Sequence, residues 1–203
     1  CTISPPGTPF SIKQLAVSNA SDIAYSVATP LVGDIDNDGI TEIVVAGGIY
    51  PDNPTYTSYL IQIFEVKDNQ ILLQQSLSVA GMGGIYAAPF SFAKVDGNDY
   101  AAIFLCTRTG NNAIADQRQL IKYIYNGTSY VEDKRVQYSS ISTKEGGIPY
   151  IADFNGDGRA EVVVYDKVFD ARTLTLLADG NLLNDATMGF GLGAYPTTGT
   201  NYG

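Results

Sequence analysis

The chain has 203 residues, of which 45% are hydrophobic, so it is long and apolar enough to bury a core and is not expected to be disordered. Its 12 basic and 21 acidic residues give a net charge of −9, and no run of Lys or Arg occurs, which argues against nucleic acid and anionic membranes as partners. The longest apolar stretches, such as Ala101 to Leu105, are far shorter than the roughly 20 residues that cross a bilayer, so no transmembrane segment is predicted.

The N-terminal segment, residues 1–26, is polar and proline-containing and leads into the first predicted strand. Its Cys1 and the later Cys106 are the two cysteines of the chain. They could form one disulfide, or Cys1 could carry a lipid anchor, with Cys106 a small buried thiol at the end of a hydrophobic strand. The residues do not decide between these interpretations.

An internal repeat organises the rest of the chain. Pro30, Pro89 and Pro149 recur 59 and 60 residues apart, and each begins a similar stretch of sequence. Such a fixed period indicates a repeat architecture, in which each unit packs against its neighbours.

Each repeat contains short runs of apolar and β-branched residues separated by turns, the pattern of strands in a hairpin-rich sheet. After the proline segments, second strands are predicted at 42–46, 102–105 and 161–165, third strands at 60–64, 120–125 and 167–169, and fourth strands at 71–73 and 174–177. The turns before the fourth strands, at 67–70, 126–129 and 170–173, contain Asn, Asp or Gly, which tolerate hairpin backbone angles.

Four antiparallel strands per repeat predict an all-β fold of the β-propeller type with about three blades, either incomplete or completed by another copy. The expected division is an N-terminal segment with a lead-in strand at 1–26, repeats at 27–79, 80–142 and 143–180, and a Gly/Tyr-rich tail at 181–203 that starts a further repeat.

The first repeat carries the motif that points to chemistry, from Asp34 to Glu42. Counting Asp34 as position 1, side-chain oxygens fall at positions 1, 3, 5 and 9, with a backbone carbonyl available at position 7. These predicted ligands are Asp34, Asp36, Asp38, Ile40 (carbonyl) and Glu42. Alternate acidic residues on a tight turn are suited to Ca²⁺, which takes six to eight oxygen ligands.

The third repeat has the same motif at the same spacing, from Asp153 to Glu161. Its predicted ligands are Asp153, Asn155, Asp157, Arg159 (carbonyl) and Glu161. An EF-hand needs Glu at position 12, where this chain has Val45 and Val164, so that motif is excluded. The alternative is a pair of Asp-Gly turns without metal, which the mutual repulsion of the acids disfavours.

The second repeat has a shortened loop in which Lys94 stands where the first aspartate would fall. Its ammonium could replace the ion by pairing with Asp96. We therefore expect two calcium ions in the chain and none in the second repeat.

These motifs resemble the FG-GAP or VCBS repeats of integrin α-subunits and of secreted bacterial proteins, in which a DxDxDGxxD/E loop binds calcium. The resemblance covers most of residues 27–180. It implies a calcium-binding, extracellular or cell-surface module for adhesion, with a protein or glycan as ligand.

Two alternatives stay open: a structural subunit that completes its β-fold with further copies of itself, and the propeller of a carbohydrate-active enzyme. The chain contains no His, and its conspicuous acids are already assigned to calcium. We therefore expect the protein not to be an enzyme.

Overall fold

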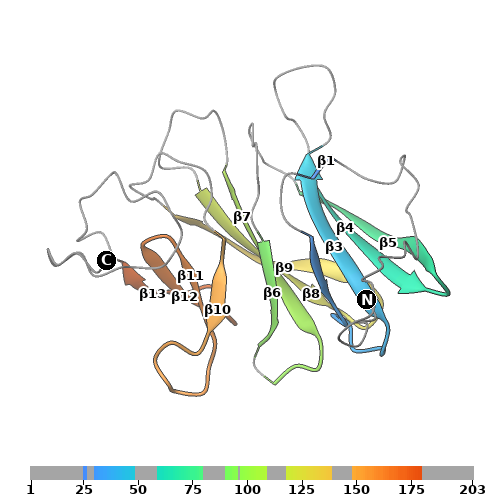
Figure 1. Cartoon of the computed structure of the whole chain (residues 1–203). Helices are drawn as coiled ribbons and strands as arrows, with labels where there is room; N and C mark the ends of the chain where they lie inside the picture. The colour runs from blue at the N-terminus through green and yellow to red at the C-terminus, as the bar shows by residue number, and fades with distance from the viewer. Residues whose placement is uncertain are drawn as a thin grey trace, which may run out of the picture.

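The computed structural model of the protein describes residues 25–26, 30–48, 59–79, 90–95, 97–108, 118–138 and 148–179. These residues form thirteen β-strands in three antiparallel sheets and no helix, which confirms the predicted all-β class (Figure 1). Among them, no helix has the length and apolarity needed to cross a membrane. Cys1, the rest of the segment before Tyr25, and the tail after Asp179 lie outside the described residues.

The three sheets follow one another along the chain, one sheet per predicted repeat. The first sheet contains β1 (Tyr25–Ser26), β2 (Leu31–Gly33), β3 (Thr41–Gly48), β4 (Tyr59–Lys67) and β5 (Gln70–Val79), with β1 and β2 both pairing with β3. The second sheet contains β6 (Phe90–Lys94), β7 (Ala101–Arg108), β8 (Arg118–Tyr125) and β9 (Tyr130–Tyr138). The third sheet contains β10 (Tyr150–Ala152), β11 (Glu161–Val164), β12 (Lys167–Asp170) and β13 (Leu176–Asp179).

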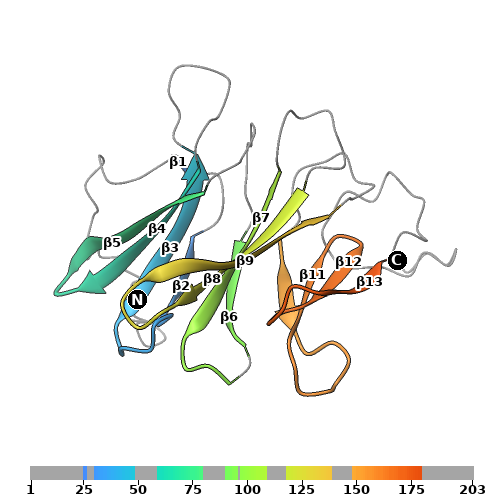
Figure 2. The same ribbon diagram turned by 180° about the vertical axis from the view of Figure 1, so that it is seen from behind.

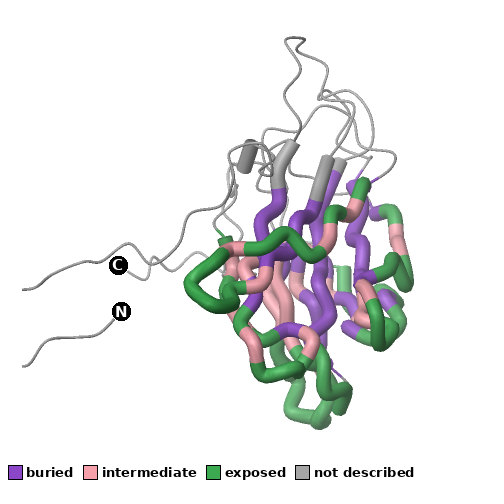
Figure 3. Tube along the Cα trace, turned by 90° about the vertical axis from the view of Figure 1, so that its right-hand side faces the viewer, coloured by how far each residue is buried: buried purple, intermediate pink, exposed green. Residues whose placement is uncertain are grey.

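The sheets stand side by side, with the second between the first and the third (Figures 1 and 2). The loops β2–β3, β6–β7 and β10–β11 all project from the same end of the molecule, at the bottom of both views. We refer to this end as the loop end. Buried residues follow the strands and exposed residues gather at the loops (Figure 3).

Strand β7 is apolar at almost every position because both of its faces are buried. Ala101, Ile103 and Leu105 pack against the first sheet, whereas the alternate residues of the same strand pack toward the third sheet. Successive side chains of a strand point to opposite faces, so a strand covered on both faces is apolar throughout. The near-continuous apolar runs in the sequence therefore come from burial on two sides.

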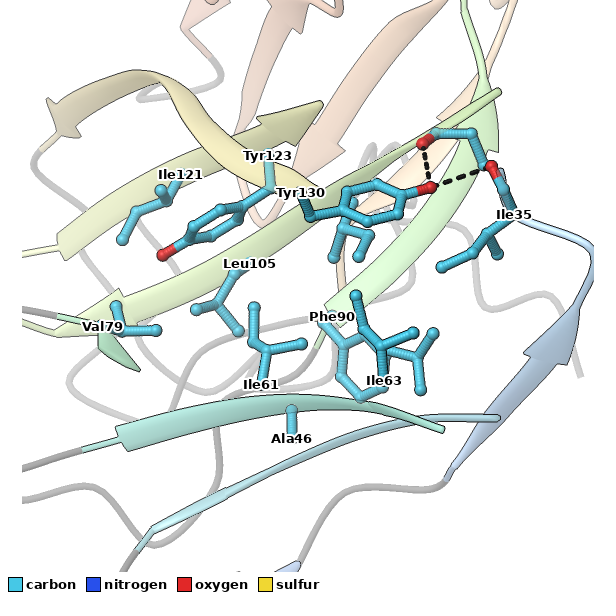
Figure 4. Packing of buried hydrophobic residues seen from close by; sticks show 13 residues of the cluster. Ile35, Ala46, Ile61, Ile63, Val79, Phe90, Leu105, Ile121, Tyr123 and Tyr130 are labelled. Atoms are coloured by element: carbon cyan, nitrogen blue, oxygen red, sulfur yellow. Dashed lines mark hydrogen bonds between the residues drawn. The ribbon is translucent and has the colours of Figure 1, made fainter. Parts of the chain in front are cut away.

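The core between the first and second sheets joins β3, β4 and β5 to β6, β7, β8 and β9 (Figure 4). Gln75 of β5 forms two hydrogen bonds to β9 at the edge of this core. Its side-chain amide donates to Tyr130 O and accepts from Tyr130 N, both at 2.8 Å. The second sheet is thus bonded to the first as well as packed against it.

The core between the second and third sheets contains Phe104, Leu120 and Val162 among its buried members. Polar contacts cross this interface too, since Lys122 Nζ donates to Arg172 O at 3.1 Å and Ser91 Oγ donates to Pro149 O at 2.6 Å. Each pair of successive sheets is therefore held together by a hydrophobic core and by hydrogen bonds.

Cys106 lies in this second core as a buried free thiol. Burial raises the pKa of its thiol to about 12. This agrees with the interpretation of Cys106 as a small hydrophobic residue.

The third repeat differs from the predicted strand ends. Strand β11 stops at Val164 because Tyr165, with φ of 55°, begins the two-residue turn to β12. The fourth strand, β13, begins at Leu176 and not at Leu174, because Leu174 has φ of 56° and belongs to the preceding turn. Both residues adopt the left-handed backbone that apolar residues seldom take, so composition gave no signal for these boundaries.

Candidate metal centre

The two aspartate-rich loops, β2–β3 and β10–β11, have the same backbone conformation. The residues at position 4, Asn37 and Gly156, have φ of 62° and 76°, and the glycines at position 6, Gly39 and Gly158, have φ of 85° and 84°. Two left-handed residues in each loop turn the chain tightly enough to bring alternate side chains toward one point.

The aspartate at position 1 ties each loop together through both of its oxygens. In the first loop, Asp34 Oδ1 accepts from Asp38 N at 3.2 Å and Asp34 Oδ2 accepts from Gly39 N at 3.1 Å. In the other loop, Asp153 accepts from Asp157 N at 3.1 Å and from Gly158 N at 2.8 Å in the same way.

The glutamate at position 9 closes each loop from the start of the following strand. Glu42 Oε2 accepts from Ile35 N at 2.8 Å, and Glu161 Oε2 accepts from Phe154 N at 2.8 Å. Both glutamates are buried. A buried carboxylate with one oxygen held by the backbone has its other oxygen available for a further partner.

The aspartate at position 5 bonds within its own turn. Asp38 Oδ1 accepts from Ile40 N at 2.7 Å, and Asp157 Oδ1 accepts from Arg159 N at 2.8 Å. The residues whose carbonyls are predicted ligands, Ile40 and Arg159, are therefore placed by equivalent hydrogen bonds. In all, four hydrogen bonds within the first loop have equivalents within the second.

These bonds gather three carboxylates in each loop. Single oxygens of Asp34, Asp36 and Glu42 lie within 4.8 Å of one another, and the second group joins three further acids in the same manner. Its members are Asp153, Asp157 and Glu161. Asp38 of the first loop stands outside this spacing, so the two groups are not identical.

The carboxylates of both groups lack a cationic partner within the described residues, since none of the ion pairs found there involves them. Burial raises the pKa of Glu42 to about 7, and the charges of Asp36, Asp38 and Asp34 add to this effect against the Ile35 N–H. The pKa of Asp36 is raised as well, first by burial and then by Asp38. The first loop therefore concentrates more negative charge than its surroundings balance.

The two loops differ at position 3. Asp36 Oδ1 is buried and has no hydrogen-bond partner. In the other loop, Asn155 Nδ2 donates to Asp157 Oδ2 at 3.2 Å and to Glu161 Oε1 at 3.1 Å. An orphaned buried carboxylate oxygen is costly, so the first loop fits a cation, and the second loop satisfies part of its charge with an amide.

The first loop is also tied to the core between the sheets. Ile35, at position 2, is fully buried in that core, and its carbonyl oxygen accepts from Ala101 N at 2.7 Å and from the Tyr130 hydroxyl at 2.8 Å (Figure 4). Tyr130 and Ala101 both belong to the second sheet. Sequence reasoning missed these contacts because nothing near Ile35 in the chain signals a tyrosine 95 residues away.

The second repeat contributes to the first loop from outside. Lys94, at the end of β6, donates from Nζ to Asn37 Oδ1 at 3.1 Å. The predicted partner of this lysine, Asp96, lies outside the described residues. The ammonium thus stands beside the first aspartate loop, a position that the local sequence did not indicate.

As a set, the loops offer hard oxygen donors in two small clusters, and such clusters could hold a divalent metal ion. Comparisons of the chain with protein-family models, with curated proteins and with solved structures gave no significant match in any of the three. The loops themselves are therefore the basis for any functional argument.

Proposed function

We propose that this protein is a non-enzymatic calcium-binding module of the FG-GAP or VCBS repeat type, with one Ca²⁺ in each aspartate loop. The observation that carries the proposal is the recurrence of four equivalent hydrogen bonds in two loops that each gather three carboxylates. A turn that served only to reverse the chain would not need the same costly grouping of acids twice.

The donor set favours calcium over other divalent ions. Zinc sites in proteins usually include Cys or His, whereas the two loops contain neither and the chain has no His. Magnesium keeps several of its waters and uses one or two carboxylates, whereas each loop gathers three. The residues that would hold the ions are those predicted from the motif: Asp34, Asp36, Asp38, Ile40 and Glu42 in the first loop, and Asp153, Asn155, Asp157, Arg159 and Glu161 in the second.

Calcium would act here as a structural clamp. It would neutralise carboxylates at the loop end and hold each loop against its sheet, and it supplies no reaction step. Weak calcium sites of this kind fill at the millimolar concentrations found outside cells, which supports an extracellular or cell-surface location. The three side-by-side sheets also support the finer proposal of a propeller-type arrangement, whose loops would present a binding surface for a protein or glycan.

Calcium binding is tested by isothermal titration of protein that has been stripped with a chelator. Two ions per chain are expected in the wild type. Asp36→Asn should weaken the first site at least tenfold, because it leaves that loop the neutral oxygen that Asn155 supplies in the second, and Asp157→Asn should remove the second ion. Asp68→Asn, in the exposed β4–β5 turn, is the matched control and keeps both. No binding at millimolar calcium would disprove the proposal, and three ions per chain would show that the second repeat was wrongly excluded.

A second readout separates the two sites. The chain has no Trp, so terbium emission excited through the protein reports on nearby tyrosines, and Tyr130 donates to the backbone of the first loop. We expect tyrosine-sensitised terbium emission to be reduced more by Asp36→Asn than by Asp157→Asn. Equal reduction by both variants would contradict the assignment of the brighter signal to the first loop.

A further inference from the structure

The three loops at the loop end differ in one respect that the metal does not explain. Position 2 of each loop is Ile35 in the first repeat, Val95 in the second and Phe154 in the third. Ile35 is 0% exposed and Val95 is 2% exposed, each in the core that its sheet shares with the following sheet. Phe154 is 55% exposed. The same position is thus a core residue twice and a surface residue once.

The face of the third sheet that points away from the second sheet shows the same contrast. Val44 of the first sheet and Val163 of the third both lie two residues after the loop glutamate, so they occupy equivalent places. Val44 is fully buried against the second sheet, whereas Val163 is only half-buried. The outward face of the third sheet is therefore built like an internal face, and no following sheet lies against it among residues 25–179 as the structure describes them.

The outward face of the first sheet has apolar residues at the positions that, in the other two sheets, pack against the preceding sheet. Each sheet has an equivalent cross-strand row of three apolar residues, which in the second and third sheets points toward the preceding sheet. These rows are Phe92, Ile103 and Tyr123 in the second sheet, Ile151, Val162 and Phe169 in the third, and Val32, Ile43 and Phe64 in the first. The first two rows pack against a neighbouring sheet, and the row of the first sheet has no preceding sheet among the described residues.

At the loop end, one member of that row and two residues beside it are exposed. Val32 is 62% exposed, and Leu73, which pairs with Phe64, is 39% exposed. Val66 shares the face of Phe64, two residues along β4, and is also exposed. Phe64 itself is buried within the chain, so the free surface is confined to these flanking positions.

We propose that a second copy of this chain docks head-to-tail, with the loop end of its first sheet on the outward face of the third sheet. Phe154 would then take the place that Ile35 and Val95 have between successive sheets. Val32 would lie over Ala152 as Phe92 lies over Gly33, where an added Cβ would come within 3.0 Å of the Phe92 ring. The contact repeats an interface that the chain already forms twice.

The number of sheets suits this arrangement. A head-to-tail contact either closes into a ring or continues as a filament. The described residues of two copies supply six sheets, three from each, and β-propellers close with about four to eight. We therefore expect a closed pair, in which each copy uses both outward faces.

Sedimentation equilibrium at physiological salt tests the proposal, because salt screens the charge of −9 that each copy carries. The wild-type chain with calcium should reach twice the mass of one chain as its concentration rises. Phe154→Asn and Val32→Asn should each raise the dissociation constant about tenfold or more, since each removes apolar burial without adding charge. Leu72→Asn is the matched control, because Leu72 is exposed but points to the opposite face from Leu73.

Mixing the two variants distinguishes the head-to-tail contact from a symmetric one. Phe154→Asn keeps an intact first sheet and Val32→Asn keeps an intact third sheet, so a mixed pair has one intact contact, whereas each variant alone has none. The mixture should therefore associate more tightly than either variant by itself. If Val32→Asn associates as the wild type does, the third sheet pairs with itself and the proposal is wrong. A wild-type chain that stays monomeric at every concentration overturns it as well, and neither result bears on calcium binding.

Discussion

The Asp36 carboxylate should destabilise the folded protein without metal and bind calcium when the ion is present. Its Oδ1 atom is buried without a hydrogen-bond partner, and its pKa is raised by burial and by the neighbouring Asp38. The ionised carboxylate is therefore unfavourable in the folded protein without metal. A bound cation would reverse this, because it provides both the missing partner and the missing charge.

Replacing Asp36 by Asn should consequently have opposite effects with and without calcium. In chelator, Asp36→Asn should raise the melting temperature, since it removes a buried negative charge. In saturating calcium it should lower the melting temperature. The free energy of unfolding should fall by about 1.4 kcal/mol for each tenfold loss of calcium affinity. Differential scanning calorimetry in the two conditions measures the sign. A decrease in both conditions would mean that Asp36 is a structural residue and not a metal ligand.

The pKa of Asp170, in the turn after β12, is shifted in the opposite direction to that of Asp36. Its Oδ1 accepts from Arg172 N at 3.0 Å, from Thr173 N at 2.6 Å and from Thr173 Oγ1 at 2.8 Å. Burial tends to raise the pKa of Asp170, but these hydrogen bonds outweigh it and the pKa is lowered from 3.8. The charged form is thus stabilised by folding.

A lowered pKa stabilises the fold above pH 3.8, and this contribution is lost as the pH falls through the value in the folded protein. Asp170→Asn should therefore lower the free energy of unfolding by about 0.5–1 kcal/mol at neutral pH, given partial exposure of the carboxylate. The difference from the wild type should shrink below pH 3.8. Urea denaturation in chelator at several pH values checks this, and a difference that does not vary with pH would rule out the charge as its cause.

At the scale of elements, two buried tyrosines of the second sheet that face the first sheet differ in the hydrogen bonds of their hydroxyl groups. Tyr130 bonds through its hydroxyl to the carbonyls of Ile35 and Ala101, at 2.8 and 3.0 Å. Tyr123, in the same core, has a buried hydroxyl with no partner, and burial raises its pKa to about 12. Only one of these hydroxyls connects the β2–β3 loop to the second sheet.

Tyr130→Phe should therefore cost about 1–2 kcal/mol of stability, because it leaves a carbonyl of the interface less satisfied. Tyr123→Phe, the matched substitution, should be neutral or slightly stabilising, since it removes a buried polar group that has no partner. Chemical denaturation of both variants gives the comparison. Equal losses would mean that the two hydroxyls are equivalent and that the loop is not anchored through Tyr130.

Element by element, the strands were predictable where their signal is local. The apolar run of β7 and the Asp68-Asn69 turn between β4 and β5 follow directly from residue types, and both turn residues have positive φ. The ends of β11 and β13 were not predictable, because Tyr165 and Leu174 take left-handed conformations that their side chains do not favour. Leu174 is buried in the second core, and Tyr165 packs against it.

For the molecule as a whole, calcium in the two aspartate loops should stabilise different numbers of sheets. The first loop is bonded to the second sheet through Ile35, whereas the equivalent Phe154 is exposed. Calcium in the first loop would thus stabilise the junction of two sheets. Calcium in the other loop would stabilise only its own sheet unless a further sheet covers Phe154.

Hydrogen exchange can detect this difference. The amide of Ala101 donates to Ile35 O, and the amide of Ala171 donates to Ala160 O beside the other loop. With calcium present, Asp36→Asn should speed exchange at Ala101 and leave Ala171 unchanged, and Asp157→Asn should do the reverse. Faster exchange at both amides in either variant would show that the sheets open together.

The sequence by itself determined the repeat, the all-β class and the two acidic loops, because turn residues and apolar spacing act over a few neighbouring residues. It also placed the acids of each loop at spacings that the backbone brings together. Only the tertiary structure decided which sheet faces are covered, that Lys94 reaches Asn37, and that Ile35 is bonded to Tyr130. Alternation along a strand assigns residues to two faces, but what lies against each face depends on contacts between residues far apart in the chain.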